Sequence, residues 1–122
     1  MTQESTESKT IYIGLDGIIQ PQQNANKIEC IVCDITEDYT EAMVIASEAF
    51  IWDQEGVKLS ILPPAEKSPI KCTGRIIWPS KGKAMLEVNN GYLMQIQITH
   101  IDQIDRERLD FAITKKKAFS NS

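Results

Sequence analysis

The feature that most constrains the fold is a two-residue alternation of apolar and polar side chains between Ile70 and Ile101. This period is typical of β-strands with one buried face, because successive side chains on a strand point to opposite sides. The alternation forms three runs, separated by the turn-forming segment 79–83 and by Asn90-Gly91, a pair typical of tight hairpins. It predicts a meander with Gln95 and Gln97 on its outer face. The side chains predicted to be buried are Cys72, Ile76, Trp78, Ala84, Leu86, Val88, Tyr92, Met94, Ile96 and Ile98.

Shorter apolar runs precede the meander. Residues 27–35 and 42–46 predict two strands that pair through the acidic turn 36–41, and residues 57–61 predict a further strand. Residues 11–19 predict a short strand broken by Gly14 and Gly17. Six or seven short strands at this spacing predict a small antiparallel barrel or sandwich.

The C-terminal part has a helical pattern. Asp102 suits a helix N-cap, an apolar stripe follows between residues 104 and 113, and the lysines at 115–117 suit the C-terminal end of a helix dipole. We therefore expect a helix from Gln103 to Lys115 that lies on the barrel. The predicted organisation is one mainly β domain over residues 10–117, with tails at 1–9 and 118–122.

Composition narrows the classes of function. A net charge of −4 disfavours DNA as a partner, and no apolar run approaches the roughly 20 residues of a membrane helix, so we expect no membrane insertion. The N-terminus lacks a signal peptide pattern, which predicts a cytoplasmic protein. Cys30 and Cys33 fall on opposite faces of a strand and are not expected to share a metal. With one histidine, His100, and no nucleophile elbow, we expect a protein that is not an enzyme and has no cofactor.

Three large apolar residues, Phe50, Ile51 and Trp52, follow one another next to a turn. Consecutive side chains on a strand cannot all point inward, so at least one is expected outside the core. Such a side chain either anchors a partner protein or packs under a neighbouring loop or the terminal helix.

The order of elements resembles the PilZ domain over roughly residues 27–114. The segments that carry this resemblance are 34–39, Phe50, 56–59, 74–78, 92–98 and 105–109. PilZ domains are six-stranded antiparallel barrels with a C-terminal helix, and many are bacterial receptors for cyclic di-GMP. The resemblance implies that fold and a place in a bacterial signalling, motility or pilus system.

The family binds cyclic di-GMP through an R-x-x-x-R motif and a [D/N]-x-S-x-x-G motif. Asp34 matches the first position of the second motif, Thr36 replaces its Ser, and Tyr39 stands where the Gly is expected. No arginine precedes Arg75, so the first motif is missing, and only Lys9 and Lys27 are cationic in that part of the chain. Two lost arginine contacts to guanine or phosphate would cost about 2–6 kcal/mol, which takes a micromolar ligand to roughly 30 μM or weaker.

The resemblance therefore implies a degenerate PilZ-like adaptor that acts by contact with another protein and binds cyclic di-GMP weakly or not at all. The expected partner surface combines an aromatic of segment 50–52 with the turn around Asp34–Glu41. The alternative is a true cyclic di-GMP receptor that uses other cations, such as Arg75, Lys9 or Lys27, or those of a second copy.

Overall fold

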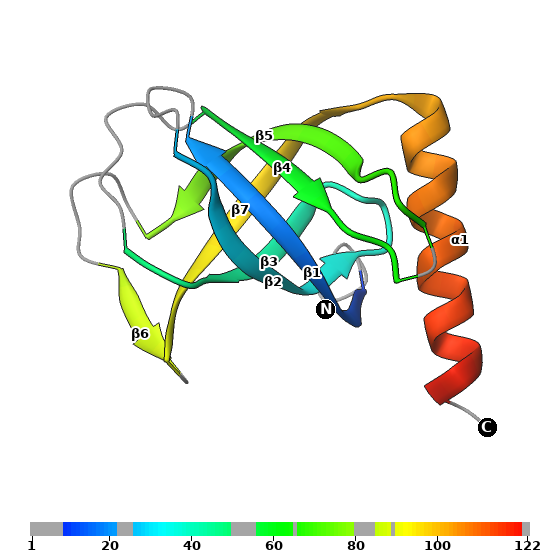
Figure 1. The fold of residues 1–122 in the computed structure, drawn as a ribbon, viewed down its shortest axis with the longest axis horizontal. Coiled ribbons are helices and arrows are strands. Elements are labelled where there is room, and N and C mark those ends of the chain that lie inside the picture. Colours follow the sequence, from blue (N-terminus) through cyan, green and yellow to red (C-terminus); the bar gives the residue numbers. More distant parts are fainter. Residues whose placement is uncertain are drawn as a thin grey trace, which may run out of the picture.

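A computed structural model describes residues 9–21, 26–49, 56–64, 66–79, 85–88 and 90–120, with side chains as far as residue 115. Within these residues, seven strands precede one helix (Figure 1). In order they are β1 (Thr10–Pro21), β2 (Ile28–Thr36), β3 (Glu41–Ala46), β4 (Gly56–Ile61), β5 (Ile70–Trp78), β6 (Leu86–Val88), β7 (Gly91–Ile101) and α1 (Gln103–Ser120).

The strands form one antiparallel sheet in the order β3-β2-β1-β4-β5-β7-β6. An additional pairing between β3 and β7 closes the first six of these into a barrel. Strand β6 lies outside the closed ring and pairs with β7 through Leu86–Val88. The structure thus confirms the predicted mainly β fold, a six-stranded antiparallel barrel followed by a C-terminal helix.

Aliphatic side chains fill the barrel in the alternating pattern that the sequence predicts. On β4, Val57, Leu59 and Ile61 are buried whereas Lys58 is exposed. Each such side chain contributes roughly 1.5–3 kcal/mol when it is removed from water, so the pattern itself holds the strands in register. The same core includes Ile13, Leu15, Ile19, Val32, Ile35, Ala42, Val44, Cys72, Ile76, Met94, Ile96 and Ile98.

Strand β1 differs from its prediction, because it is one strand of 12 residues and its two glycines do not end it. The pairing with β2 shifts register between Tyr12 and Leu15, and Gly14 there has a φ of 56°. A side chain on Gly17 would meet the carbonyl oxygen of Ser60 at 2.8 Å. The glycines therefore allow a bulge and a close strand approach within a continuous strand.

Two residues of the meander predicted to be buried are exposed. Trp78 is 40% exposed and Leu86 is 50% exposed. The pairing of β5 with β7 shifts register between Ile76 and Trp78, which changes the direction of the side chains after Ile76. Alternation in β6 does not produce a buried face because β6 lies outside the ring, and Val88 is half-buried. Of the other residues in that prediction, Tyr92 is half-buried and Ala84 lies outside the described residues.

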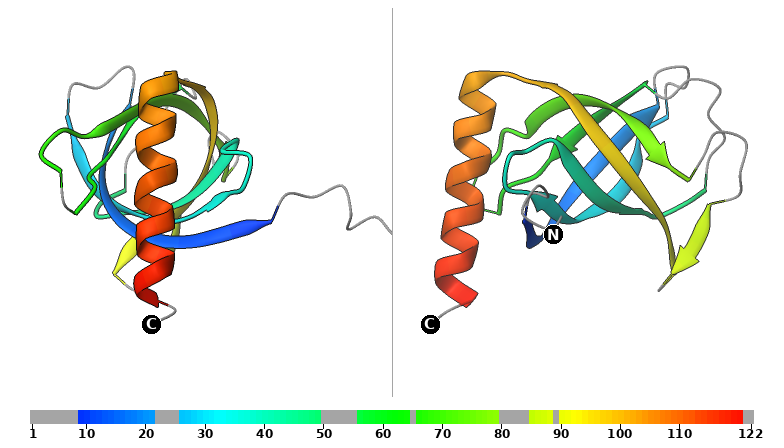
Figure 2. Two further views of the ribbon diagram at one scale, coloured as in Figure 1. Left: turned by 90° about the vertical axis from the view of Figure 1, so that its right-hand side faces the viewer. Right: turned by 180° about the vertical axis from the view of Figure 1, so that it is seen from behind.

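Helix α1 runs across one open end of the barrel (Figure 2). Leu109, Ala112 and Ile113 are buried and join the barrel core. The helix begins at Gln103, as predicted, and the carbonyl of Asp102 accepts a hydrogen bond from the Arg106 N–H at 2.8 Å. It continues to Ser120, beyond both the predicted helix end at 115 and the expected domain boundary at 117.

Arg108 fastens α1 to the loop between β4 and β5. Its guanidinium donates to Glu66 Oε1 at 2.6 and 3.0 Å and to Asp105 Oδ1 at 3.0 Å. It also donates to the carbonyl oxygens of Ser68 and Pro69. A planar group with several donors suits such a bridge, since it satisfies carboxylates and backbone carbonyls together.

The described part of the chain contains no helix long and apolar enough to span a bilayer.

Candidate functional site

The turn between β2 and β3 is held by hydrogen bonds of its own side chains. Thr36 Oγ1 accepts from the N–H groups of Thr40 and Glu41, both at 3.1 Å. Asp38 Oδ1 accepts from Thr40 Oγ1 at 2.7 Å and from the Thr40 N–H at 3.3 Å. Short polar side chains stabilise turns in this way without any ligand, so these residues have a structural role in the turn.

Tyr39 links this turn to helix α1. Its hydroxyl donates to Asp110 Oδ1 at 2.6 Å, and the Arg106 guanidinium carbon lies 5.1 Å from the centroid of its ring. Burial, followed by the hydrogen bond to Asp110, raises the pKa of Tyr39 to about 12. The backbone φ of Tyr39 is 61°, a conformation that favours glycine and costs other residues roughly 1–2 kcal/mol. The contacts with α1 offset this cost.

Asp34 precedes this turn on the outer side of β2. It pairs with Tyr12 of β1 and Met43 of β3, and it is half-buried. The pKa of the Asp34 carboxyl is raised, because the effect of burial exceeds the opposite effect of a hydrogen bond from the backbone of Met43. Strand β2 and its turn thus bring together three of the four residues expected at a ligand site, Asp34, Thr36 and Tyr39.

Arg75, the fourth residue, lies away from the turn on β5. The register across β3, β7 and β5 places Glu41, Gln97 and Arg75 in one row, so two strand spacings of roughly 5 Å each separate Arg75 from Glu41. Its Nε donates to Gln97 Oε1 at 2.8 Å. Of the two lysines named as alternatives, Lys9 is beside the turn, because its carbonyl accepts from the Glu37 N–H at 2.8 Å.

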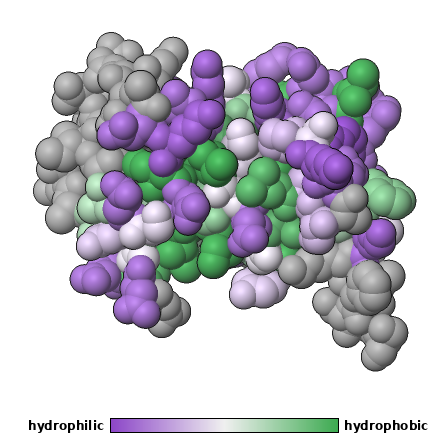
Figure 3. All heavy atoms as spheres, viewed as in Figure 1, coloured by the Kyte–Doolittle hydropathy of each residue, from purple (hydrophilic) through white to green (hydrophobic). Residues whose placement is uncertain are grey.

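Exposed and half-buried apolar side chains gather on the outside of the barrel over β2, β3, β7 and β6 and at the end of β5. We call this surface the apolar face and define it as Ile31, Met43, Ile45, Trp78, Leu86 and Leu93. Cross-strand pairing aligns Ile31, Ile45, Leu93 and Leu86 in one row, and in the next row Gln95 lies between Met43 and Trp78. Ile31 is 46% exposed, and Met43, Ile45 and Leu93 are half-buried. Figure 3 shows hydrophobic patches between hydrophilic side chains on the outside of the barrel.

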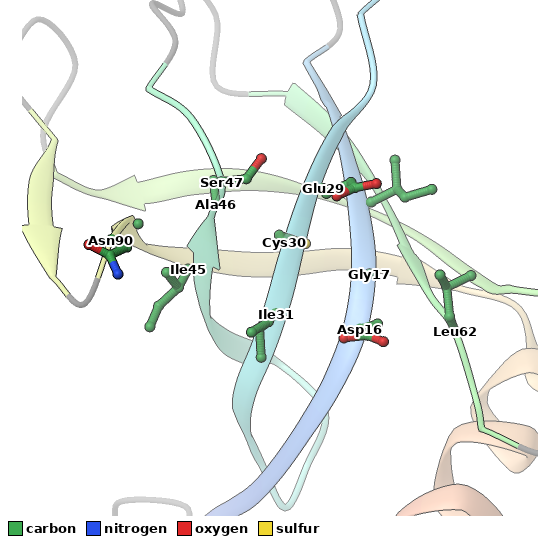
Figure 4. A pocket seen from close by; sticks show the side chains of 12 residues that line it. Asp16, Gly17, Glu29, Cys30, Ile31, Ile45, Ala46, Ser47, Leu62 and Asn90 are labelled. Carbon is green, nitrogen blue, oxygen red and sulfur yellow. The ribbon is translucent and has the colours of Figure 1, made fainter.

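Acidic side chains border the apolar face on β1 and β2. Asp16 is opposite Ile31, Asp34 is opposite Met43, and Glu29 is on β2 two residues before Ile31. A shallow groove of about 460 Å³ runs here and is lined by Asp16, Glu29, Ile31 and Ile45, among others. Figure 4 shows Ile31 and Ile45 on the neighbouring strands β2 and β3, with Asp16 on β1.

The sequence interpretation missed the apolar face, although a signal for it exists. Strand β2 carries Ile31 and Cys33 at outward positions and Val32 and Ile35 at inward positions. An apolar run of this kind suggests a strand that is buried on both sides. In a barrel with only one interior, the same run implies a second apolar surface on the outside. The expected anchors Phe50, Ile51 and Trp52 lie outside the described residues.

The cysteines occupy different environments in the barrel wall. Cys30 and Cys72 are buried, and burial raises the pKa of each thiol to about 12. Cys33 is half-buried, and burial raises the pKa of its thiol as well. Among the described residues, no group of three or more His, Cys, Asp or Glu side chains is placed to hold a metal ion.

Comparisons with known proteins give one partial similarity. No family model matches the sequence. Over 81 residues, or 65% of this chain, the sequence is 26% identical to a Mus musculus protein described as "Phosphatidylinositide phosphatase SAC2". The chain spans only 7% of the length of that protein, and this similarity does not establish a family. No solved structure matches.

Proposed function

We propose that this protein is a PilZ-like adaptor of a cyclic di-GMP-linked bacterial system. It acts by binding another protein, and it binds the nucleotide weakly or not at all. The observation that carries this proposal is the position of Tyr39. In the family that the sequence resembles, the corresponding turn contacts the nucleotide and has glycine at this position. Here a tyrosine takes the conformation that favours glycine, and its side chain contacts helix α1.

The arginines support the same proposal because each already has a partner within the chain. Arg106 lies over the Tyr39 ring, and Arg108 binds Glu66 and Asp105. Arg75 bonds to Gln97 on the neighbouring strand. A ligand that recruited one of these groups would first have to displace a hydrogen bond or a cation–π contact, which reduces the net gain in binding free energy.

The apolar face supports the protein-binding part of the proposal. Contiguous apolar surface outside a core is a mark of protein contact sites, and large side chains such as Trp78 are frequent anchors there. The acidic border formed by Asp16, Glu29 and Asp34 favours a partner with basic residues around an apolar centre. Contact of this kind needs no catalytic group and no cofactor.

Calorimetric titration with cyclic di-GMP tests the nucleotide part. We expect a dissociation constant above roughly 30 μM, because two arginine contacts are missing. A low-micromolar isotherm would contradict the proposal and favour the receptor alternative. The variant Arg75→Ala would then show whether Arg75 contributes to binding.

Comparative affinity capture tests the protein part. Immobilised wild-type protein is compared with Ile31→Lys, which puts a charge in the apolar face, and with Ile104→Lys as a control. Ile104 is 71% exposed and lies on α1, outside the face. We expect one protein to be retained by the wild type and by Ile104→Lys but lost with Ile31→Lys, with circular dichroism confirming that each variant is folded. Equal retention by all three would show that the apolar face is not the contact surface.

A further inference from the structure

The charges of the barrel are segregated by strand, which the net charge of −4 conceals. Strands β4, β5 and β7 contain no Asp or Glu, and they carry the cations Lys58, Lys71 and Arg75 together with His100. Strands β2 and β3 show the opposite pattern, with three acidic residues and no Lys or Arg. The wall formed by β4 and β5 is therefore a local electropositive surface on an acidic protein.

A groove of about 500 Å³ lies on this wall. Its lining includes Lys27, Lys58, Lys71 and His100, and Asp102 is the one carboxylate among the described residues that line it. The remaining polar lining includes Gln20, Ser60 and Thr73. This volume falls in the range of small-molecule sites.

Strand register places two lysines and His100 around Thr73. Lys58 on β4 is directly opposite Thr73, and His100 on β7 is opposite it on the other side. Lys71 precedes Thr73 by two residues on β5 and shares its outward face. Opposite residues are roughly 5 Å apart and diagonal ones roughly 7–8 Å, so flexible lysine side chains can converge over the Thr73 hydroxyl.

The two nearby carboxylates each have a partner other than these lysines. Asp102 Oδ1 is 2.9 Å from His100 Nε2. Asp105 Oδ1 binds Arg108, and its Oδ2 accepts from the backbone N–H of Lys71 at 3.3 Å. None of the side-chain ion pairs among the described residues involves Lys27, Lys58 or Lys71. Their ammonium groups are therefore available to an anionic ligand.

We propose that this groove binds a small molecule that carries two or more phosphate monoester groups, which distinguishes its ligand from the phosphodiester cyclic di-GMP. Lysine ammoniums recognise phosphate as point charges with three donors each, and the hydroxyls of Ser60 and Thr73 can donate to further phosphate oxygens. Lys58 and Lys71 lie on the neighbouring strands β4 and β5, and Lys27 lies just before β2. Lysines spread in this way can contact more than one phosphate, which favours a multiply phosphorylated ligand. The proposal is independent of the adaptor function, because it uses the wall of β1, β4, β5 and β7 rather than the apolar face.

Two probes test the site and distinguish the sources of such a ligand. Soluble inositol trisphosphate represents a free phosphorylated molecule, and phosphatidylcholine vesicles with and without phosphatidylinositol bisphosphate represent a lipid headgroup. Amide chemical shifts of ¹⁵N-labelled protein are followed during titration with the soluble probe. Co-sedimentation measures binding to vesicles.

We expect inositol trisphosphate to shift the amides of Lys58, Lys71, Thr73 and His100 in a saturable way. The double variant Lys58→Gln/Lys71→Gln is expected to weaken binding about ten-fold, since it removes two exposed charge contacts. The control Lys115→Gln removes one exposed charge about 20 Å along α1 from its start and is expected to leave the affinity unchanged. Binding to vesicles only when they contain the phosphorylated lipid, with the same response to the variants, would assign the site to a headgroup.

Two results would overturn the proposal. One is the absence of saturable shifts with inositol trisphosphate together with equal sedimentation on both kinds of vesicle. The other is an equal loss of affinity in Lys115→Gln and in the double variant. Equal losses would show that the ligand is attracted to lysines in general and not to this groove. Both variants replace exposed side chains, so their folding is checked by the dispersion of the amide spectrum.

Discussion

Replacement of Leu109 by alanine tests whether helix α1 is part of the barrel core. The Leu109 side chain is fully buried where α1 crosses the end of the barrel. Leu-to-Ala changes at such positions cost about 2.7–5 kcal/mol, and the cost depends on how far the site collapses around the lost volume. A helix packed on one end can shift toward the barrel, so we expect a loss of about 3 kcal/mol. With an unfolding entropy of about 2.1 cal/mol/K per residue over 122 residues, this lowers the melting temperature by about 12 °C.

The assay is urea denaturation followed by far-ultraviolet circular dichroism, with thermal melts for comparison. Ile104→Ala is the matched control, because it also shortens an aliphatic side chain on α1 but at a position that is 71% exposed. We expect the control to change stability by less than about 0.5 kcal/mol, since alanine favours helix slightly more than isoleucine does. A loss below about 1 kcal/mol for Leu109→Ala, or equal losses for the two variants, would refute the docking of α1 on the barrel.

Three further predictions follow from the barrel. Trp78→Ala is expected to lower the free energy of unfolding, measured by urea denaturation, by about 1–2 kcal/mol. Loss of a fully buried ring would cost about 3–5 kcal/mol, but Trp78 is 40% exposed. A loss in that higher range would show that the ring is in the core. Gly74→Ala is expected to destabilise by at least about 2 kcal/mol, since the new Cβ would clash with the backbone oxygen of Gln97; an unchanged urea midpoint would contradict this. Stability should fall above pH 9, because the unfolded thiols of Cys30 and Cys72 ionise near 9 whereas their folded pKa values are about 12. Above pH 9 the folded state binds more protons than the unfolded state, so the free energy of unfolding should fall by about 1.4 kcal/mol per pH unit for each thiol. The double variant Cys30→Ala/Cys72→Ala should reduce this dependence on pH.

The barrel could largely be predicted from the sequence because each strand carries its own pattern of buried and exposed side chains. The alternation of Val57, Leu59 and Ile61 sets the face of β4 without reference to any other strand. The predictions were wrong where the pairing between strands overrides the local pattern of side chains. The register shift before Trp78 depends on β7, and the close approach at Gly17 depends on Ser60 of another strand.

The candidate sites depend on contacts between distant parts of the chain, which no local pattern contains. Tyr39 contacts Asp110 only because α1 crosses the barrel end beside the turn. The cationic groove likewise combines single lysines from separate segments, each unremarkable in its own stretch of sequence. Sequence motifs identified Asp34 and Thr36 as candidates, but the reason for a tyrosine at position 39 becomes visible only in three dimensions.

The closure of the barrel by β7 has a consequence for how the protein is made. Strand β3 (Glu41–Ala46) completes its pairing only with β7 (Gly91–Ile101), which is the last strand of this barrel to leave the ribosome. At a synthesis rate of about 5–20 residues per second, β3 therefore waits for several seconds with one edge unpaired. During that time the nascent chain exposes backbone donors and acceptors beside Ile31 and Ile45, a combination that promotes intermolecular strand pairing. Slower translation lengthens this interval, so the yield of folded protein in cells should depend on chaperones that shield the β2–β3 hairpin until β7 arrives.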